Sequence, residues 1–455
     1  MKFLRGVAVC FGVLGILGSP LARASNPIIT TSYSADPSAH IFEGRMYVYP
    51  SHDRDDAREF DMIDYHVYSS DDMENWQDHG VVLRLKNIPW AKSHLWAPDC
   101  GYRNGKYYLY FPAQDAKGVF RIGVAVGNSP SGPFVASRRP IPGVKGIDPS
   151  IFTDSDGQAY LIWAGSGNRV LMAKMKPNML ELDGAPKQLE GADNFFEGPW
   201  IFRRKGKYYL TYPAFKPHGV GRGGHGQNYD YAMADNISGP YSYKGPLTQS
   251  GPGGDNIHGS QLQWGNHWYC FYHDFSTSKG FADQGYKRNV RVDEMFFNPD
   301  GTIQPLRWTK TGPAKRKNAD PYVRMQAETL NMTDVPEGPH AIAVDTDAAG
   351  DVYLGPVKND DWVRYANLDF GSGAGKFIAR VATPVGGGTI ELHLDTMFGP
   401  EIGECQVRYT GGWQNWEMIA CSISHATGVH NLYLKFTDTH AGGLFDLDWF
   451  EFFKK

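Results

Sequence analysis

The stretch ADPSAHIFEGRMYVY at residues 35–49 decides the fold, because a close copy, IDPSIFTDSDGQAYLIW, returns at residues 147–163. In both, an Asp-Pro pair precedes a short apolar strand, a glycine turn and an aromatic strand. Three more stretches repeat the turn and the aromatic strand, so that the turn glycines are Gly44, Gly105, Gly157, Gly206 and Gly265, spaced by 61, 52, 49 and 59 residues. This period has room for four short strands and is typical of a propeller blade. The sequence therefore predicts an all-β protein that begins with a five-bladed β-propeller over residues 25–315.

Composition agrees with this prediction and narrows the classes of function. The 455 residues include 14% aromatic side chains, 53 Gly and 29 Pro, which favour short strands joined by tight turns. A chain of this length is expected to form two or three domains. The formal net charge is −4, so the chain lacks the basic field with which proteins hold nucleic acid. We expect no nucleic-acid partner.

The N-terminus has the pattern of an export signal over residues 1–24. Lys2 and Arg5 precede an apolar stretch, and Ala22-Arg23-Ala24 forms a small-x-small cleavage site. The apolar stretch is shorter than the ~20 residues that a membrane span needs. We therefore expect a secreted or periplasmic protein with no membrane association after the signal is removed.

Four cysteines remain after the signal. Cys405 and Cys421 lie at equal distances from Trp413 in an expected hairpin and could form a disulfide in an oxidising compartment. Two buried thiols are the alternative. Cys100 and Cys270 lie among apolar or aromatic residues and are expected in the core.

A polar residue precedes each turn glycine at a nearly constant distance. The five are Asp36, Asp99, Asp148, Glu197 and His258, which stand 8, 6, 9, 9 and 7 residues before the glycine. If each begins the strand that lines the propeller axis, their side chains meet at one mouth of the channel. Asp before Pro is also common turn chemistry, so a single such Asp favours a structural role. The recurrence of carboxylates at equivalent places favours a shared function for Asp36, Asp148 and Glu197.

Carboxylates gathered in one cleft suit the hydrolysis of glycosidic bonds, which needs one neutral acid and one ionised base. Glu197 lies in the apolar stretch NFFEGPW, a setting that raises the pKa of a carboxyl group, and is the predicted general acid. Asp36 lies between Ser34 and Ser38 and is the predicted general base. Asp148 is expected to raise the pKa of Glu197 by charge repulsion and to orient it.

The set ADPS, HLWAPD, GIDPSIFTDSDGQAYLIW and FFEGPWIF, with SHD at 51–53, DYHVYSSDDMENW at 64–76 and RNVRVDEMFFNPDGT at 288–302, resembles glycoside hydrolase family 43. The resemblance covers about the first two thirds of the chain. It implies a five-bladed propeller and an inverting mechanism with an Asp base, an Asp modulator and a Glu acid. It also implies that Arg288 lies in the sugar pocket, and that His258 lies near an axial calcium or sodium ion. Further substrate contacts are expected from Trp96, Asp99 and Phe196; core packing is the alternative for Phe196.

The glycine-rich stretch from Phe215 to Tyr231 is expected to be a long loop beside the acid, either a pocket wall or a connector. Its His218 and His225 are separated by glycines, and we do not predict a zinc site there.

A change of pattern near residues 311–322 predicts a domain boundary, with a linker at 316–322 and a β-sandwich at 323–455. The first strand, RMQAETLNM, and the last, LFDLDWFEFF, both alternate and can pair. Gln326 and Glu328 share one strand face, and Asp448 can meet them from the last strand. Three oxygen donors suit a structural calcium ion, and an ordinary exposed edge is the alternative. No organic cofactor is expected.

This second domain is similar to carbohydrate-binding module family 6 through NDDWVRYANLDF, TGGWQNWE and LFDLDWFEF. The resemblance implies a jelly-roll sandwich with a structural calcium ion, and a sugar held between Tyr353 and Trp413. The chain has Gly442-Gly443 where many members have Gly-Asn, a departure at the usual sugar cleft.

Together these observations predict a secreted, inverting, exo-acting glycoside hydrolase on plant hemicellulose, either an α-L-arabinofuranosidase or a β-xylosidase. Its expected partner is a plant polysaccharide or oligosaccharide. A hydrolase of the same fold that acts on galactan or arabinogalactan is an alternative within enzymes. A noncatalytic sugar-binding propeller is the alternative of another class, but a lectin has no need of a paired acid and base.

Overall fold

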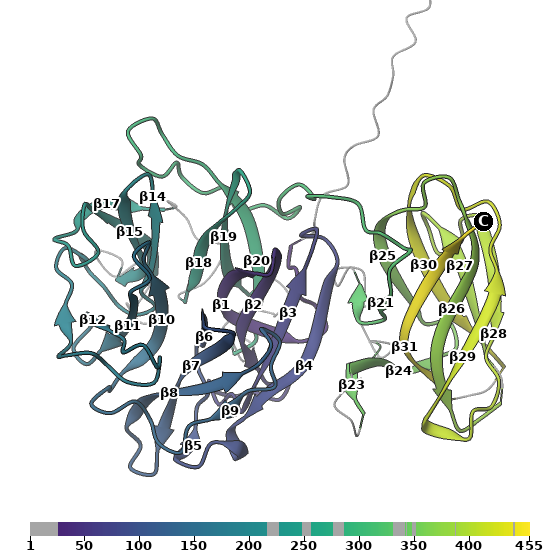
Figure 1. Ribbon diagram of the computed structural model, residues 1–455, viewed down its shortest axis with the longest axis horizontal. Coiled ribbons are helices and arrows are strands. Elements are labelled where there is room, and N and C mark those ends of the chain that lie inside the picture. The colour runs from purple at the N-terminus through teal and green to yellow at the C-terminus, as the bar shows by residue number, and fades with distance from the viewer. Residues whose placement is uncertain are drawn as a thin grey trace, which may run out of the picture.

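The computed structural model describes residues 26–215, 227–247, 256–275, 286–330, 342, 344–347, 352–386, 388–439 and 442–455 (Figure 1). The predicted export signal lies outside these residues. The described chain is all-β, and its one helical element is the short 3₁₀ turn η1 (Leu85–Asn87). Among the described residues, none of the helices has the length and hydrophobicity to cross a bilayer.

Antiparallel sheets follow one another through the N-terminal part of the chain. Sheet I contains β1 (Tyr33–Phe42), β2 (Arg45–Asp53), β3 (Asp64–Ser70), β4 (Trp76–Arg84) and β22 (Thr329–Leu330). Sheet II contains β5 (Ala91–Ser93), β6 (Asp99–Arg103), β7 (Lys106–Asp115), β8 (Phe120–Gly127) and β9 (Val135–Ala136). Sheet III contains β10 (Ile147–Thr153), β11 (Ala159–Gly165), β12 (Arg169–Lys174) and β13 (Lys187–Gln188). Sheet IV contains β14 (Trp200–Arg204), β15 (Lys207–Phe215), β16 (Gln227–Ala234) and β17 (Ser242–Pro246). Sheet V contains β18 (Gly259–Trp264), β19 (His267–Asp274) and β20 (Asn289–Met295).

Each repeated unit of the sequence becomes the first hairpin of one of these sheets. The five turn glycines have φ between 62° and 83°, a left-handed conformation that glycine adopts without steric cost. The leading strands of the hairpins contact one another in a cycle, from β1 to β6, β10, β14, β18 and back to β1. This cycle brings the polar residues at the starts of the five strands toward a common axis.

The two Asp-Pro pairs lie within strands, at irregularities of the pairing. The register between β1 and β2 shifts between Ala35 and Ser38, and that between β10 and β11 shifts between Ile147 and Ser150. Asp36 and Asp148 have φ of 49° and 53°, values uncommon for residues other than glycine. Pro has no N–H to donate to a strand partner, and a β-bulge is one of the places where that missing donor is tolerated. The bulge leaves the preceding Asp side chain out of the regular alternation.

The C-terminal part contains two sheets. One contains β23 (Val344–Thr346), β24 (Val352–Lys358), β31 (Gly443–Lys454), β26 (Ala374–Thr383) and β29 (Gly412–Ser422), and β21 (Met325–Gln326) pairs with β31. The other contains β25 (Trp362–Asp369), β30 (Val429–Thr437), β27 (Thr389–Leu394) and β28 (Glu401–Gln406). The predicted pairing of the domain's first and last strands is therefore present.

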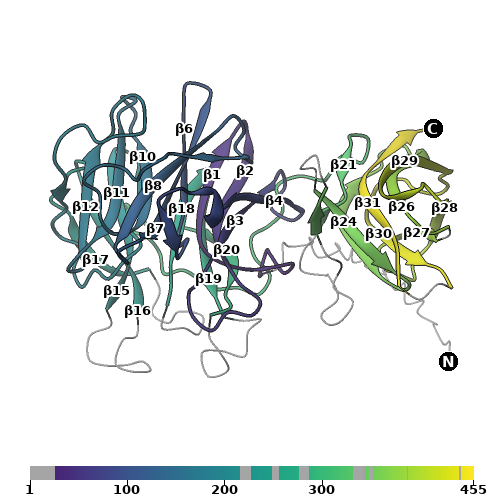
Figure 2. The same ribbon diagram turned by 90° about the horizontal axis from the view of Figure 1, so that it is seen from below.

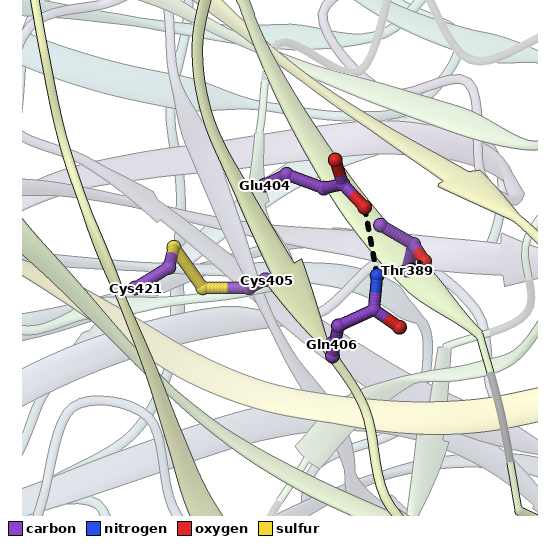
Figure 3. Close-up of a disulfide and its surroundings, with 5 residues drawn as sticks. All are labelled: Thr389, Glu404, Cys405, Gln406 and Cys421. Atoms are coloured by element: carbon purple, nitrogen blue, oxygen red, sulfur yellow. Dashed lines mark hydrogen bonds between the residues drawn. A yellow bond between two sulfur atoms is a disulfide. The ribbon is translucent and has the colours of Figure 1, made fainter.

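A disulfide joins these two sheets. Cys405 on β28 and Cys421 on β29 are bonded, and their Cα atoms are 5.2 Å apart (Figure 3). The two strands are not the hairpin that we expected, because each belongs to a different sheet. Cys405 points toward Cys421, whereas its neighbours Glu404 and Gln406 point away and are hydrogen-bonded to each other at 2.7 Å. Cys100 and Cys270 are free and buried, as predicted.

The two parts of the chain are continuous in structure. Strand β22, which follows the predicted boundary, pairs with β4 and so extends sheet I. Figure 2 shows β24 on the side of the C-terminal part that faces β4. One cluster of buried apolar side chains includes Trp76 of sheet I together with Leu330, Tyr365 and Phe450. Without β22, strand β4 would be the edge of sheet I, and the backbone N–H and C=O groups on an edge can pair with an added strand.

Candidate active site

All three predicted catalytic carboxylates line one cavity, with a volume of about 730 Å³. Asp36 comes from β1, Asp148 from β10, and Glu197 from the segment just before β14. The full lining comprises Asp36, Phe60, Met62, Trp96, Ile147, Asp148, Phe196, Glu197, Phe215, Gln227, Asn256, His258 and Arg288. Apolar groups supply most of the exposed surface of the walls, although seven of the thirteen lining residues are charged or polar. This composition is common in sites that bind a small polar ligand.

Asp36 is held as an anion by its neighbours. Arg288 Nη1 donates to Asp36 Oδ1 at 2.9 Å, and Ser51 Oγ donates to Oδ2 at 2.7 Å. Burial alone would raise the pKa of Asp36, but the charge of Arg288 and the contact with His258 outweigh it and hold this pKa far below its usual value. An ionised carboxylate at the cavity wall can accept a proton from water.

Glu197, in contrast to Asp36, is held in its protonated form. Burial and the negative charge of Asp148 raise the pKa of Glu197 to about 8, so that this carboxyl group is protonated at neutral pH. Burial also raises the pKa of Asp148, to about 6, and repulsion from Asp36 adds to the effect. Asp148 Oδ2 accepts a hydrogen bond of 3.0 Å from the backbone N–H of Gly198, directly after the acid. Asp148 therefore contacts the segment that carries Glu197.

A hydrogen-bonded bridge connects the two carboxyl groups. Arg288 Nη1 donates to the side-chain oxygen of Asn256 at 3.0 Å, and Asn256 Nδ2 donates to Glu197 Oε1 at 3.2 Å. Because an arginine can only donate, it fixes which end of the amide faces the acid. Asp53 holds Arg288 in turn through two bonds, Nε to Oδ2 at 2.9 Å and Nη2 to Oδ1 at 2.8 Å. The chain Asp53–Arg288–Asn256 thus fixes the position of Glu197 relative to Asp36.

Three of the four predicted substrate contacts line the cavity: Trp96, Phe196 and Arg288. Asp99 is not among the lining residues and is fully buried. Its carboxylate accepts from the backbone N–H of Ile151 at 2.6 Å and lies 2.5 Å from His40 Nε2. This placement does not support substrate binding by Asp99, because both oxygens already bridge neighbouring sheets.

His258 lines the cavity, with Nδ1 3.5 Å from Asp36 Oδ1. A Cβ atom on Gly198 would lie 2.9 Å from the His258 ring, so glycine is needed directly after the acid. Burial lowers the pKa of His258, but the contact with Asp36 and the negative charge of Asp148 outweigh burial and raise this pKa.

Sequence reasoning missed several groups of the site. Asn256 and Gln227 contact Glu197, but nothing in their local sequence distinguishes them. Ser51 and Asp53 belong to the SHD motif that contributed to the family resemblance, and that motif was a usable signal. Of the predicted loop at 215–231, residues 216–226, with His218 and His225, lie outside the described residues. Its last five residues instead belong to strand β16, and Phe215 and Gln227 line the cavity.

The predicted calcium ligands also come together, in a second pocket of about 550 Å³. Gln326, Glu328 and Asp448 all line it. Gln326 Oε1 and Glu328 Oε2 are buried without a hydrogen-bond partner. Buried oxygens without donors fit a calcium ion, which prefers oxygen ligands. Asp448 also pairs with Arg380, and Gln77 of β4 donates to Glu328 Oε1 at 3.3 Å.

The predicted sugar-stacking pair in the C-terminal part differs from expectation. Trp413 is 37% exposed, but Tyr353 is 6% exposed and packs edge-to-face against Trp416, with ring centroids 5.3 Å apart. Little of the Tyr353 ring is therefore free to stack on a sugar.

Two family models match this chain, one in each of its two parts. Residues 24–303 match the model for glycosyl hydrolases family 43, and residues 334–454 match that for carbohydrate binding module (family 6). An arabinoxylan arabinofuranohydrolase from Paenibacillus polymyxa is 34% identical over 95% of this chain and 75% of its own length. A xylosidase/arabinosidase from Bacteroides ovatus is 34% identical over 61% of this chain and 95% of its own length.

Among solved structures, the family 43 arabinoxylan arabinofuranohydrolase from Bacillus subtilis, in complex with cellotetraose, is similar over 95% of this chain and 98% of that chain. The TM-score is 0.81 and the sequence identity 29%. The similarity extends through both parts of the chain.

Proposed function

This chain belongs to glycosyl hydrolase family 43, and from that premise we propose that it is a secreted or periplasmic, inverting, exo-acting glycoside hydrolase on plant hemicellulose, cleaving α-L-arabinofuranosyl or β-xylosyl residues. The observation that carries the proposal is the shared cavity of Asp36, whose pKa is lowered, and Glu197, whose pKa is raised to about 8. The arabinoxylan arabinofuranohydrolase that resembles both parts of the chain supports the choice of substrate.

In the proposed reaction, the Asp36 carboxylate removes a proton from a water molecule as its oxygen attacks the anomeric carbon. The bond between that carbon and the leaving oxygen breaks, and Glu197 gives its proton to the leaving oxygen. Water attacks from the face opposite the leaving group, so the product sugar has the inverted configuration. Asp36 then releases its proton to solvent, and Glu197 takes one up. Asp148 contributes a negative charge that keeps Glu197 protonated between turnovers.

The domain organisation belongs to the same proposal: a five-bladed propeller at 25–315, a linker at 316–322 and a β-sandwich module at 323–455. The successive sheets and the cyclic contacts of β1, β6, β10, β14 and β18 support the propeller. The two sheets joined by Cys405–Cys421 support the sandwich. A propeller would place the catalytic cavity at one end of its axis.

A structural calcium ion in the module would be held by Gln326, Glu328 and Asp448. Two of these residues have unpartnered buried oxygens, which an ion would satisfy. Removal of calcium by a chelator should lower the melting temperature of the full chain, because the ion binds only the folded state. An unchanged melt, with metal content checked before and after, would contradict this assignment. An axial calcium or sodium ion near His258 also stays a prediction.

The substrate is tested with nitrophenyl α-L-arabinofuranoside, β-D-xyloside and β-D-galactoside and with arabinoxylan. We expect turnover of the arabinofuranoside or the xyloside and release of monosaccharide from the polymer. Glu197→Ala and Asp36→Ala, each checked for folding by circular dichroism, are the controls. Activity on the galactoside alone would favour the galactan-directed alternative, and inactivity of the folded wild type on a broad glycoside panel would favour a binding protein.

The stereochemical course is tested separately by proton NMR of the first sugar released. Inversion predicts that the anomer formed first is opposite to that of the substrate. Retention would rule out the base role of Asp36.

A further inference from the structure

A second chemically distinctive cluster lies outside the catalytic cavity, on sheet I. His52 of β2 and Asp64 and His66 of β3 bring one ligand atom each to within 4.8 Å of one another. Within the described ranges, it is the single group of three or more His, Cys, Asp or Glu side chains that come this close. None of the three lines the cavity or the calcium pocket.

Carboxylates fix how both imidazole rings are protonated. His52 Nδ1 lies 2.6 Å from Asp64 Oδ1, and His66 Nδ1 lies 2.9 Å from Asp78 Oδ1. An ionised carboxylate can only accept a hydrogen bond, so Nδ1 is the donor in each ring. In neutral His66 the lone pair is then on Nε2, and a histidine whose other nitrogen is held by a carboxylate is the usual arrangement around a protein-bound metal ion. His52 Nδ1 and Asp64 Oδ1 face each other, so an ion bound by both would take the place of the proton between them.

The two rings are close enough to share a ligand. Their centroids are 4.8 Å apart, and their planes meet at 64°. The His52 and His66 side chains keep 23% and 15% of their surface exposed, so an ion from solvent can reach them. Arg84 meets Asp64 Oδ2 at the long distance of 3.4 Å. This contact is weak enough to yield to a divalent ion.

We propose that His52, Asp64 and His66 form a binding site for a divalent transition metal ion of the zinc class. Two imidazoles and one carboxylate match the preference of zinc for nitrogen and oxygen ligands and differ from the all-oxygen set that calcium prefers. Three protein groups leave one position for water. Because His52 precedes Asp53, which holds Arg288, the ion would brace β2 next to the catalytic bridge.

The test is isothermal titration of metal-depleted full-length protein with zinc, in excess calcium so that oxygen-rich sites are filled. The wild type should bind zinc with a saturable component that His52→Gln and His66→Gln each weaken by about tenfold or more. His430→Gln is the matched control, because His430 Nδ1 contacts Asp395 at 2.8 Å as a single His–Asp pair. That variant should bind like the wild type. Equal affinity in all four proteins would overturn the proposal.

A second measurement needs no variant and so does not depend on their folding. Diethylpyrocarbonate modifies accessible histidines, and peptide mass spectrometry reads each one separately. Zinc should reduce the modification of His52 and His66 but not of His430. Equal modification of His52 and His66 with and without zinc would overturn the site.

Discussion

At the scale of single residues, the site separates the protonation states of carboxyl groups that share one cavity. Asp36 accepts hydrogen bonds from the guanidinium of Arg288 and the hydroxyl of Ser51, whereas the hydrogen bonds that Glu197 accepts from the described residues come from the amides of Asn256 and Gln227. A full positive charge stabilises an anion far more than a neutral donor does. The difference in partners therefore favours an ionised Asp36 and a protonated Glu197, the states that the proposed base and acid need.

The leaving group distinguishes these two roles. A nitrophenolate departs with little help from an acid, whereas a sugar alkoxide needs a proton. We expect Glu197→Gln to lower kcat by about 10²–10⁴-fold on arabinoxylo-oligosaccharides and by much less on the nitrophenyl glycoside. Asp36→Asn should lower both by similar factors, because water must be activated in either case. Steady-state kinetics on the two substrate types measures the split; equal losses for Glu197→Gln would contradict its role as the acid.

The pH profile follows from the same pKa values. Glu197 is active when protonated and its pKa is raised to about 8, so kcat/KM should hold at neutral pH and fall as the pH rises through about 8. Asp148→Asn removes a negative charge that helps to raise this pKa. The alkaline limb should then move to lower pH.

Asp156→Asn, at an exposed turn, removes the same charge far from the cavity and should leave the profile unchanged. An alkaline limb that does not move in Asp148→Asn would show that Asp148 does not tune the acid.

At the scale of elements, irregular turns and cross-links connect neighbouring sheets, which the regular pairing of strands within one sheet does not do. The bulges at Asp36-Pro37 and Asp148-Pro149 sit next to serines that reach across to neighbouring sheets: Ser38 Oγ donates to Pro98 O at 2.6 Å and Ser150 Oγ to Pro199 O at 2.7 Å. Each strand irregularity thus places an Asp side chain at the cavity and a Ser side chain in contact with the neighbouring sheet.

The Cys405–Cys421 disulfide is the corresponding device in the C-terminal part. The two cysteines are 16 residues apart, and closing a loop of about this length stabilises a protein by about 3 kcal/mol. Cys405→Ser/Cys421→Ser should lower the free energy of unfolding by about 2–4 kcal/mol in urea titrations. Wild-type protein with a reductant is the comparison, and unchanged stability of the double variant would argue against a bond in solution.

At the scale of the whole molecule, the two parts share strands and core. Asn75, directly before β4, forms two hydrogen bonds with the backbone of Ala366 of β25: its Nδ2 donates to the carbonyl at 2.9 Å, and its Oδ1 accepts from the N–H at 2.7 Å. Lys315 adds a bond of 2.6 Å to Asn367. The orientation of the module relative to the cavity is therefore set by specific contacts.

Asn75→Ala tests this coupling. It leaves two backbone groups of Ala366 without partners in a buried place, at a cost of about 1–3 kcal/mol for each. Calorimetry should show the unfolding of the two parts separating into resolved steps. Asn298→Ala is the control. It removes a hydrogen bond of 2.9 Å to Thr302 in a turn that is not part of this contact, and it should keep the wild-type unfolding pattern. An unaltered melt in Asn75→Ala would mean that the two parts are not coupled at this contact.

The residues that could be predicted from sequence are those with a local signature. The recurring Asp-Pro and glycine-turn patterns located the leading hairpins and the three carboxylates that line one cavity, because turns and strand starts depend on neighbouring residues. Asp99 carried the same signature but turned inward to Ile151 and His40, where sequence spacing could not distinguish it. Asn256 carries no signature, because its role exists only through Arg288 and Glu197.

The sequence by itself determined the all-β class and the family, and it singled out the candidate acid and base, since each depends on a short motif or on repetition of one. Only the tertiary structure decided that Asp53, Arg288 and Asn256 form a bridge between those groups, that β22 joins sheet I, and that His52 lies beside His66. These features depend on contacts between residues remote in the chain. Such contacts follow from the packing of sheets, which no local pattern specifies.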